Sequence, residues 1–184
     1  MLVLGLSGSL RCGSYNRQLL ATAAGELPVG DQFEVFERLA EIPPYSEDVE
    51  APEPVVALRA TIACADVVLI ATPEYNGSVP GQLKNALDWA SRPFPDNSLR
   101  GKPVAVIGAS TGLFGALWAQ AELRKVLNTI GARVLDRELP IGEAHQAFDS
   151  DGGLADDRLR TELTALVAEL RTASPTGHAG TTAA

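Results

Sequence analysis

The residues from Gly8 to Asn16, Gly-Ser-Leu-Arg-Cys-Gly-Ser-Tyr-Asn, could bind an anion. Small residues let the backbone approach a ligand, and Arg11 carries a positive charge. Ser9, Ser14 and Asn16 add neutral hydrogen-bonding groups. The loop precedes a predicted helix, whose N-terminus offers unpaired N–H groups and the positive end of a dipole. This combination predicts a phosphate site, although Ser14 has an alternative role as the N-cap of that helix.

The same loop departs from two other nucleotide-binding motifs. Gly8 and Gly13 have the spacing of a P-loop, but Ser14-Tyr15 stands where that motif has Lys-Ser/Thr. The pattern Gly-x-Gly-x-x-Gly of dinucleotide-binding folds is also missing. An NTPase and a dinucleotide site are therefore disfavoured, and a mononucleotide monophosphate fits better.

A second unusual stretch, PEYNGSVPGQLKNALDW, starts at Pro73 directly after an apolar run. Pro73 fixes φ after the run, and Asn76-Gly77 predicts a turn with positive φ. Pro80 stands at the start of a predicted helix, where its missing N–H costs little. Such a pre-shaped backbone can point N–H groups at the edge of a flat heterocycle such as a flavin, with Tyr75 packed beside it. A tight strand-to-helix connection without a ligand is the alternative.

A third loop, Gly108–Gly115, is rich in glycine and carries the hydroxyls of Ser110 and Thr111, which could line the same ring. It also spells Gly-x-Ser-x-Gly, the nucleophile elbow of serine hydrolases, and Asp136 and His145 follow in the required order. The glycines after the serine delay the helix that an elbow needs, and the chain is short for that fold. A serine hydrolase is therefore the less favoured alternative.

Hydrophobic periodicity predicts five strands, each followed by a helix. The strands are expected at 2–6, 33–36, 67–72, 104–108 and 132–135, and the helices at 14–24, 55–65, 81–90, 116–130 and 156–172. The helix at 116–130 has an apolar side of Leu117, Ala121, Leu123, Leu127 and Ile130.

This alternation predicts an α/β fold, a flavodoxin-like three-layer sandwich with a five-stranded parallel sheet of order 2-1-3-4-5. Residues 1–172 would form one domain and 173–184 a flexible tail. Ligands of such sheets bind at the carboxyl ends of the strands, near the switch between strands 1 and 3, where the three unusual loops meet.

Composition excludes several partners. The net charge of -8 argues against general binding of nucleic acid or an anionic membrane, and no apolar run approaches the ~18 residues of a membrane span. Cys12 and Cys64 form no metal or redox motif. We therefore expect no metal site. No signal peptide is recognisable, so we expect a cytoplasmic protein.

Four stretches resemble the NAD(P)H-dependent FMN reductase family, which includes bacterial quinone and chromate reductases. They are GSLRCGSYN, IPPYSEDVE, PEYNGSVPGQLKNALDW and GASTGLFGALWAQAELRKVL, and the similarity runs from about Leu2 to Thr172. The resemblance implies a flavodoxin-like fold, the cofactors FMN and NAD(P)H, and a homodimer or homotetramer whose flavin site lies close to the subunit interface.

The resemblance also implies which residues hold FMN. They are Ser9, Arg11, Ser14, Tyr15 and Asn16 in the phosphate loop, Pro73, Glu74, Tyr75, Asn76 and Gly77 around the isoalloxazine ring, and Ser110, Thr111 and Gly112 closing the ring site. Two positions depart from the family pattern. Cys12 replaces a basic or polar residue, and Trp118 stands where many members have arginine.

The function that follows is two-electron transfer from NAD(P)H through FMN to a quinone, an azo compound, chromate or free flavin. No catalytic side chain is expected, because the flavin supplies the chemistry. Glu74 would have a structural role or accept a hydrogen bond, and Lys84, Asn85 and Asp88 would serve solvation, packing or oligomer contacts. The alternatives are an electron carrier that does not oxidise NAD(P)H, an FMN-binding regulator, and the hydrolase using Ser110.

Overall fold

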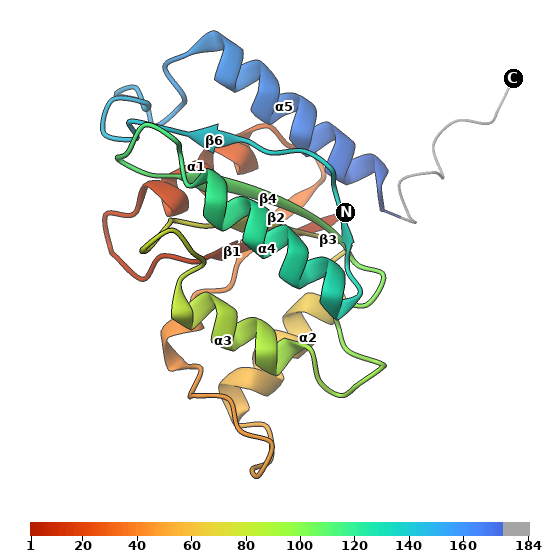
Figure 1. The fold of residues 1–184 in the computed structure, drawn as a ribbon. Helices are drawn as coiled ribbons and strands as arrows, with labels where there is room; N and C mark the ends of the chain where they lie inside the picture. Colours follow the sequence, from red (N-terminus) through yellow and green to blue (C-terminus); the bar gives the residue numbers. More distant parts are fainter. Residues whose placement is uncertain (175–184) are drawn as a thin grey trace, which may run out of the picture.

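A parallel β-sheet forms the middle layer of the molecule (Figure 1). The computed structural model describes residues 1–174. Residues 175–184 of the predicted tail lie outside the described residues. The strands are β1 (Leu2–Ser7), β2 (Gln32–Val35), β3 (Val67–Ala71), β4 (Pro103–Ala109), β5 (Arg133–Val134) and β6 (Pro140–Ile141). Their order, β2-β1-β3-β4-β5, confirms the predicted 2-1-3-4-5 sheet.

Helices cover both faces of the sheet. They are α1 (Tyr15–Gly25), α2 (Glu53–Cys64), α3 (Gly81–Ala90), α4 (Leu117–Ile130) and α5 (Asp157–Thr172), with a short 3-10 helix at Leu39–Glu41. One apolar core joins α2, α3 and α4 to the sheet, and a second core joins α1 and α5 to its other face. In Figure 1, α5 lies above the sheet and α2 and α3 below it. The predicted three-layer sandwich is confirmed.

Strand β3 shows why the sheet is central. All five of its residues are buried, and they alternate between the two cores, with Val68 and Ile70 on one side and Val67 and Leu69 on the other. A strand covered on both faces reads as a continuous apolar run rather than as an alternating one. The end of this apolar run marks the end of β3 at Ala71, and the second loop follows from there.

The fifth strand departs from the prediction of one strand at 132–135. Only Arg133–Val134 pair with the beginning of β4, and β6 pairs with its far end at Gly108 and Ala109. The charged residues 136–138 separate the two pieces. Pro140 cannot donate a ladder hydrogen bond, yet it is tolerated as the first residue of an edge strand. The prediction of a single strand at 132–135 therefore misses β6.

The apolar side of α4 is also shifted from the predicted one. Ala121 is exposed, whereas the polar Gln120 is fully buried. The Gln120 side-chain amide donates to the Gly115 carbonyl (3.0 Å), and its oxygen accepts from the Leu139 N–H (3.2 Å). Because both ends of the amide are paired, burial of this polar side chain costs little.

Candidate active-site cleft

The loops after β1, β3 and β4 meet at a cavity of about 110 Å³ at the carboxyl ends of these strands. Of the predicted site residues, all but Asn76, Gly77 and Gly112 line it, and Ala109 is an addition. The lining consists of Ser9, Arg11, Ser14, Tyr15, Asn16, Pro73, Glu74, Tyr75, Ala109, Ser110 and Thr111. Loops that are far apart in the sequence are thus brought together at the switch point of the sheet.

The first loop ends in a capped helix. Ser14 is the N-cap of α1, and its hydroxyl oxygen accepts from the N–H groups of Asn16 (3.2 Å) and Arg17 (3.4 Å). The capping role proposed for Ser14 as an alternative is therefore realised. No acidic side chain occupies the first turn of α1. The positive end of the helix dipole thus faces the cleft without a carboxylate from its own helix to neutralise it.

Two groups of the first loop have no partner within the described residues. Arg11 is exposed at the cleft, and it is the one arginine among residues 1–174 whose guanidinium has no hydrogen-bond or ion-pair acceptor. The Ser9 hydroxyl likewise has no partner in this part of the chain, although the residue is only 4% exposed. An unpaired cation and a partly buried hydroxyl beside a helix N-terminus fit a phosphate group.

Asn16 joins the first loop to the third. Its side-chain amide donates to the Ala109 carbonyl (2.9 Å), and its oxygen accepts from the Ala109 N–H (3.0 Å). Asn16 is 3% exposed and Ala109 1%. This pairing leaves one amide hydrogen of Asn16 for a ligand, so the side chain mainly positions the end of β4.

The second loop is a tight two-residue turn. Tyr75 and Ser78 exchange backbone hydrogen bonds of 3.1 and 3.2 Å, and both intervening residues have positive φ, 55° at Asn76 and 76° at Gly77. These angles define a type I′ turn, which Asn-Gly favours because it tolerates the left-handed region. The predicted positive-φ turn is confirmed. It places Asn76 and Gly77 at the tip and holds Tyr75, which is 46% exposed, at the cleft.

Two carboxylates lock the second loop against α4. The helix begins after Ala116, which has φ 61° and no side-chain cap, and the Glu74 carboxylate instead accepts from the Ala119 N–H (3.1 Å). In return, Glu122 on α4 accepts from the Ser78 hydroxyl (2.6 Å). Glu74 thus accepts a hydrogen bond, as predicted, and caps a helix from another loop.

The third loop packs against β6 and the residues that follow it. Ser110 donates its N–H to the Ile141 carbonyl (3.0 Å) and accepts from the Ala144 N–H (3.0 Å). Gly115 has φ 57°, and a Cβ there would lie 2.5 Å from the Ile141 nitrogen. Only glycine fits this position, which fixes the path of the loop from the cleft to α4.

The hydrolase triad is not assembled within the described residues. The Ser110 hydroxyl donates weakly to the Gly112 carbonyl (3.4 Å), whereas the His145 ring contacts Gln146 and Asp136 pairs with Arg124. A nucleophile elbow also requires a helix directly after the serine, and α4 begins only at Leu117. The Gly-x-Ser-x-Gly pattern is therefore a coincidence of a glycine-rich loop.

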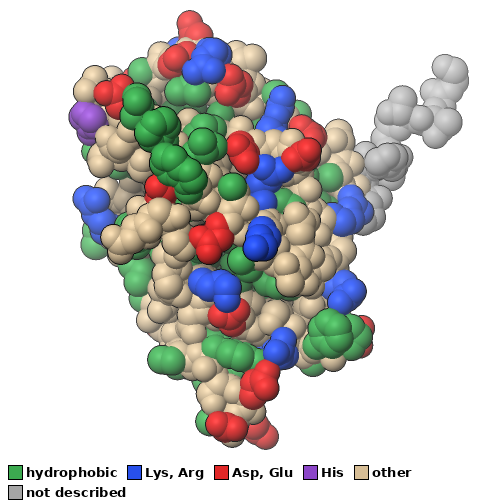
Figure 2. Space-filling model, in the orientation of Figure 1, with side chains coloured by type: hydrophobic (Ala, Val, Ile, Leu, Met, Phe, Trp, Pro, Cys, Tyr) green, Lys and Arg blue, Asp and Glu red, His purple; other side chains and the backbone are tan. Residues whose placement is uncertain are grey.

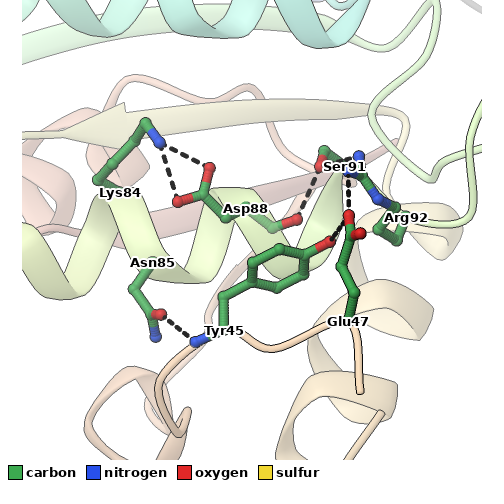
Figure 3. A network of polar contacts seen from close by, with 7 residues as sticks. All are labelled: Tyr45, Glu47, Lys84, Asn85, Asp88, Ser91 and Arg92. Atoms are coloured by element: carbon green, nitrogen blue, oxygen red, sulfur yellow. Dashed lines mark hydrogen bonds and ion pairs between the residues drawn. The ribbon is translucent and has the colours of Figure 1, made fainter. Parts of the chain in front are cut away.

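The polar residues of α3 serve contacts away from the cleft (Figure 3). Lys84 pairs with Asp88 one turn later (2.6 Å). Asn85 accepts from the Tyr45 N–H (2.7 Å) and donates to the Pro43 carbonyl (2.8 Å), which fastens the loop before α2. These contacts agree with the solvation and packing roles predicted for this helix.

Sequence reasoning missed Ala109 in the lining of the cleft, and it missed Gln120 and Glu122 among the residues that support the surrounding loops. Their contributions come from contacts between distant segments, and only the burial of a glutamine on a helix could have drawn attention to one of them. No helix of the described residues is long and apolar enough to cross a membrane.

The fold is that of a flavodoxin-like α/β protein, and the cleft with the unpaired Arg11 lies at the switch point of its sheet. The sequence model of the NADPH-dependent FMN reductase family matches residues 1–146. The chain is 48% identical over 162 residues to an NAD(P)H-dependent FMN reductase of Pseudomonas aeruginosa, with 86% of each chain covered. It is 40% identical over 159 residues to a 2-hydroxy-1,4-benzoquinone reductase of Burkholderia sp, with 85% of this chain and 86% of that one covered.

Among solved structures, the chain is similar to FerB, a flavoenzyme NAD(P)H:(acceptor) oxidoreductase from Paracoccus denitrificans. The TM-score is 0.81 at 35% identity, with 94% of this chain and 98% of FerB covered. The chain belongs to the NADPH-dependent FMN reductase family, and the resemblance seen in the sequence is confirmed.

Proposed function

We propose that this protein is an NAD(P)H-dependent FMN reductase that transfers two electrons to a quinone-type acceptor. The observation that carries the proposal is the unpaired Arg11 beside the Ser9 hydroxyl and the N-terminus of α1, at the switch point of a flavodoxin-like sheet. This donor set fits the phosphate of FMN. When bound, FMN would supply two-electron transfer between NAD(P)H and the acceptor.

The residues of the cleft would hold FMN in two parts. Arg11, Ser9 and the first turn of α1 would bind the phosphate through charge-assisted hydrogen bonds. The backbone of the second loop, from Pro73 to Gly77, would orient the ring, and Ser110 to Gly112 would close the site. The type I′ turn and the Glu74 contact keep this backbone in place before the ligand arrives.

No side chain is assigned a catalytic proton transfer. The Glu74 carboxylate is engaged with the N-terminus of α4, and the Ser110 hydroxyl is turned toward Gly112. The protein's contribution would therefore be position and electrostatics.

For the electron acceptor we propose a chemical class, the quinones. The names of two relatives, a 2-hydroxy-1,4-benzoquinone reductase and a quinone reductase, support quinones over the azo compounds, chromate and free flavin also considered. The proposal further includes a cytoplasmic location, a single domain over residues 1–172 and a homodimer or homotetramer. The oligomer follows from the family resemblance, which runs from about Leu2 to Thr172 and so covers this one domain.

NAD(P)H oxidation by the FMN-loaded protein separates the enzyme from an electron carrier or a regulator. Without oxygen, we expect NADPH or NADH to be consumed beyond one equivalent per FMN only when a quinone is also present. Arg11→Ala should weaken FMN binding by about 1.5–3 kcal/mol, the contribution of a hydrogen bond to a charged group. Arg158→Ala, an exposed arginine on α5, is the matched control and should bind FMN like the wild type. FMN binding without NAD(P)H oxidation would favour the carrier or the regulator.

A further inference from the structure

Three large apolar side chains lie exposed beside the cleft. Leu113 is 72% exposed, Phe114 55% and Trp118 51%. The rings of Phe114 and Trp118 meet edge to face, with centroids 5.0 Å apart. Figure 2 shows hydrophobic side chains gathered over the loop that joins β4 to α4 and the start of α4. We call these three residues the apolar rim. An exposed cluster of this kind is a common mark of a binding site.

The contacts of α4 place the apolar rim at the mouth of the cleft. Trp118 directly precedes Ala119, whose N–H binds the Glu74 carboxylate. One turn further along the same helix face, Glu122 accepts from Ser78. Trp118 lies one turn before Glu122 on the same face of α4, which places it on the side of the helix that meets the second loop at Ser78. Leu113 and Phe114 continue the third loop directly from its cleft-lining residues.

The path of the third loop keeps the rim outside the core. A Cβ on Gly142 would lie 2.2 Å from the Leu113 carbonyl oxygen, and a Cβ on Gly115 would lie 2.5 Å from the Ile141 nitrogen. Backbone packed this closely on both sides of Phe114 leaves the loop little freedom. Binding to a loop whose backbone is already held in position loses less conformational entropy than binding to a mobile loop.

We propose that the apolar rim binds the flat, uncharged ring of the electron acceptor, and that Phe114 and Trp118 are specificity-determining residues for quinones. The inference rests on the proposed function. The side chains of the rim carry no charge, and the carboxylates of Glu74 and Glu122, which join the second loop to α4, are both hydrogen-bonded. Aromatic side chains favour stacked or edge-to-face contact with a planar ring. A small inorganic anion has no such face and would gain nothing from the rim.

The reaction that this contact would serve is the two-electron reduction of a quinone. NAD(P)H and one proton react with a quinone to give NAD(P)⁺ and a hydroquinone. The quinone takes up two electrons and two protons, one equivalent of hydride from NAD(P)H and one proton from water. The rim contributes binding and orientation, and it breaks or forms no bond itself.

The test compares Trp118→Ala and Phe114→Ala with Trp118→Phe. Phe94→Ala is the matched control, because this ring is 74% exposed and lies in the loop after α3. Isothermal titration calorimetry measures the affinity of 1,4-naphthoquinone for the oxidised, FMN-loaded protein in the absence of NADPH. Steady-state kinetics then compare naphthoquinone with ferricyanide, which has no aromatic ring.

We expect Trp118→Ala to weaken naphthoquinone binding about tenfold, or about 1.4 kcal/mol. Trp118→Phe should lose less, and FMN affinity and ferricyanide reduction should not change. Unchanged naphthoquinone affinity in both alanine variants would overturn the inference and leave the proposed function intact. A wild-type protein that binds no FMN would remove the proposed function itself. A lower mass of Trp118→Ala in light scattering would assign the rim to contact between copies instead.

Discussion

Replacement of Glu74 by alanine separates a structural role of this carboxylate from a role in ligand binding. The carboxylate accepts from the Ala119 N–H at 3.1 Å, at the start of a helix whose N-cap, Ala116, offers no side-chain acceptor. Removing it leaves that N–H without its partner and releases one of the two contacts that hold the second loop against α4. We therefore expect a loss of stability in the protein without any ligand.

The magnitude follows from the kind of bond. A hydrogen bond to a charged group contributes about 1.5–3 kcal/mol, and loss of a helix cap costs about 0.5–2 kcal/mol. Because Glu74 is only half-buried, we expect Glu74→Ala to lower the free energy of unfolding by about 1.5–2 kcal/mol. Glu74→Gln keeps an acceptor and loses the charge at the helix N-terminus, so it should lose about 0.5–1 kcal/mol.

Urea denaturation of the FMN-free protein, followed by tryptophan fluorescence, measures both variants. Melting temperatures should fall by roughly 3–8 °C for Glu74→Ala, given about 2–4 °C per kcal/mol for a domain of this size. Glu50→Ala, which removes an exposed carboxylate without a hydrogen-bond or ion-pair partner among residues 1–174, controls for the loss of charge. Unchanged stability of Glu74→Ala together with lost FMN binding would refute the capping role and show that the carboxylate contacts the ligand.

Two further variants test other parts of the structure. Asn16→Ala leaves the buried N–H and carbonyl of Ala109 unpaired, so the free energy of unfolding should fall by about 2–4 kcal/mol, and FMN should bind more weakly. A variant as stable as the wild type in urea titration would contradict a stabilising role of the Asn16–Ala109 hydrogen bonds. The amino group of Met1 and the Arg171 guanidinium lower the pKa of Asp31 below its ordinary value of 3.8, against the opposing effect of burial. The stabilisation that ionised Asp31 contributes is therefore complete above the pKa of this carboxyl in the unfolded chain, and it is lost as the pH falls through the lower pKa in the folded protein. From pH 5 downward, the free energy of unfolding should therefore drop more steeply in the wild type than in Asp31→Asn.

The sequence predicts the layers of this fold well because their causes are local. Buried strands such as Val67–Ala71 read as apolar runs, and helices end where periodicity ends. Ser14 and the Asn76-Gly77 turn follow from the preferences of these residues for caps and positive φ. Strand order then follows from the alternation of strands and helices, and strand order determines which loops meet.

The contacts that hold the loops of the cleft in place could not be predicted in the same way. Asn16 and Ala109 are 93 positions apart, and Glu74 and Ala119 are 45 positions apart, so no local pattern connects them. The interrupted fifth strand depends on where charged residues can reach water, and the burial of Gln120 depends on partners in two other segments. Sequence reasoning finds the residues that can meet a ligand more readily than the residues that hold them.

Titration of the FMN-free protein with FMN, monitored by the quenching of flavin fluorescence, tests the central claim most directly. The account predicts saturable binding of one FMN per chain, a yellow complex, and an affinity that falls at least tenfold in Arg11→Ala but not in Arg158→Ala. Absence of binding, or equal affinities of the two arginine variants, would contradict the assignment of the cleft beside Arg11 to the phosphate of FMN.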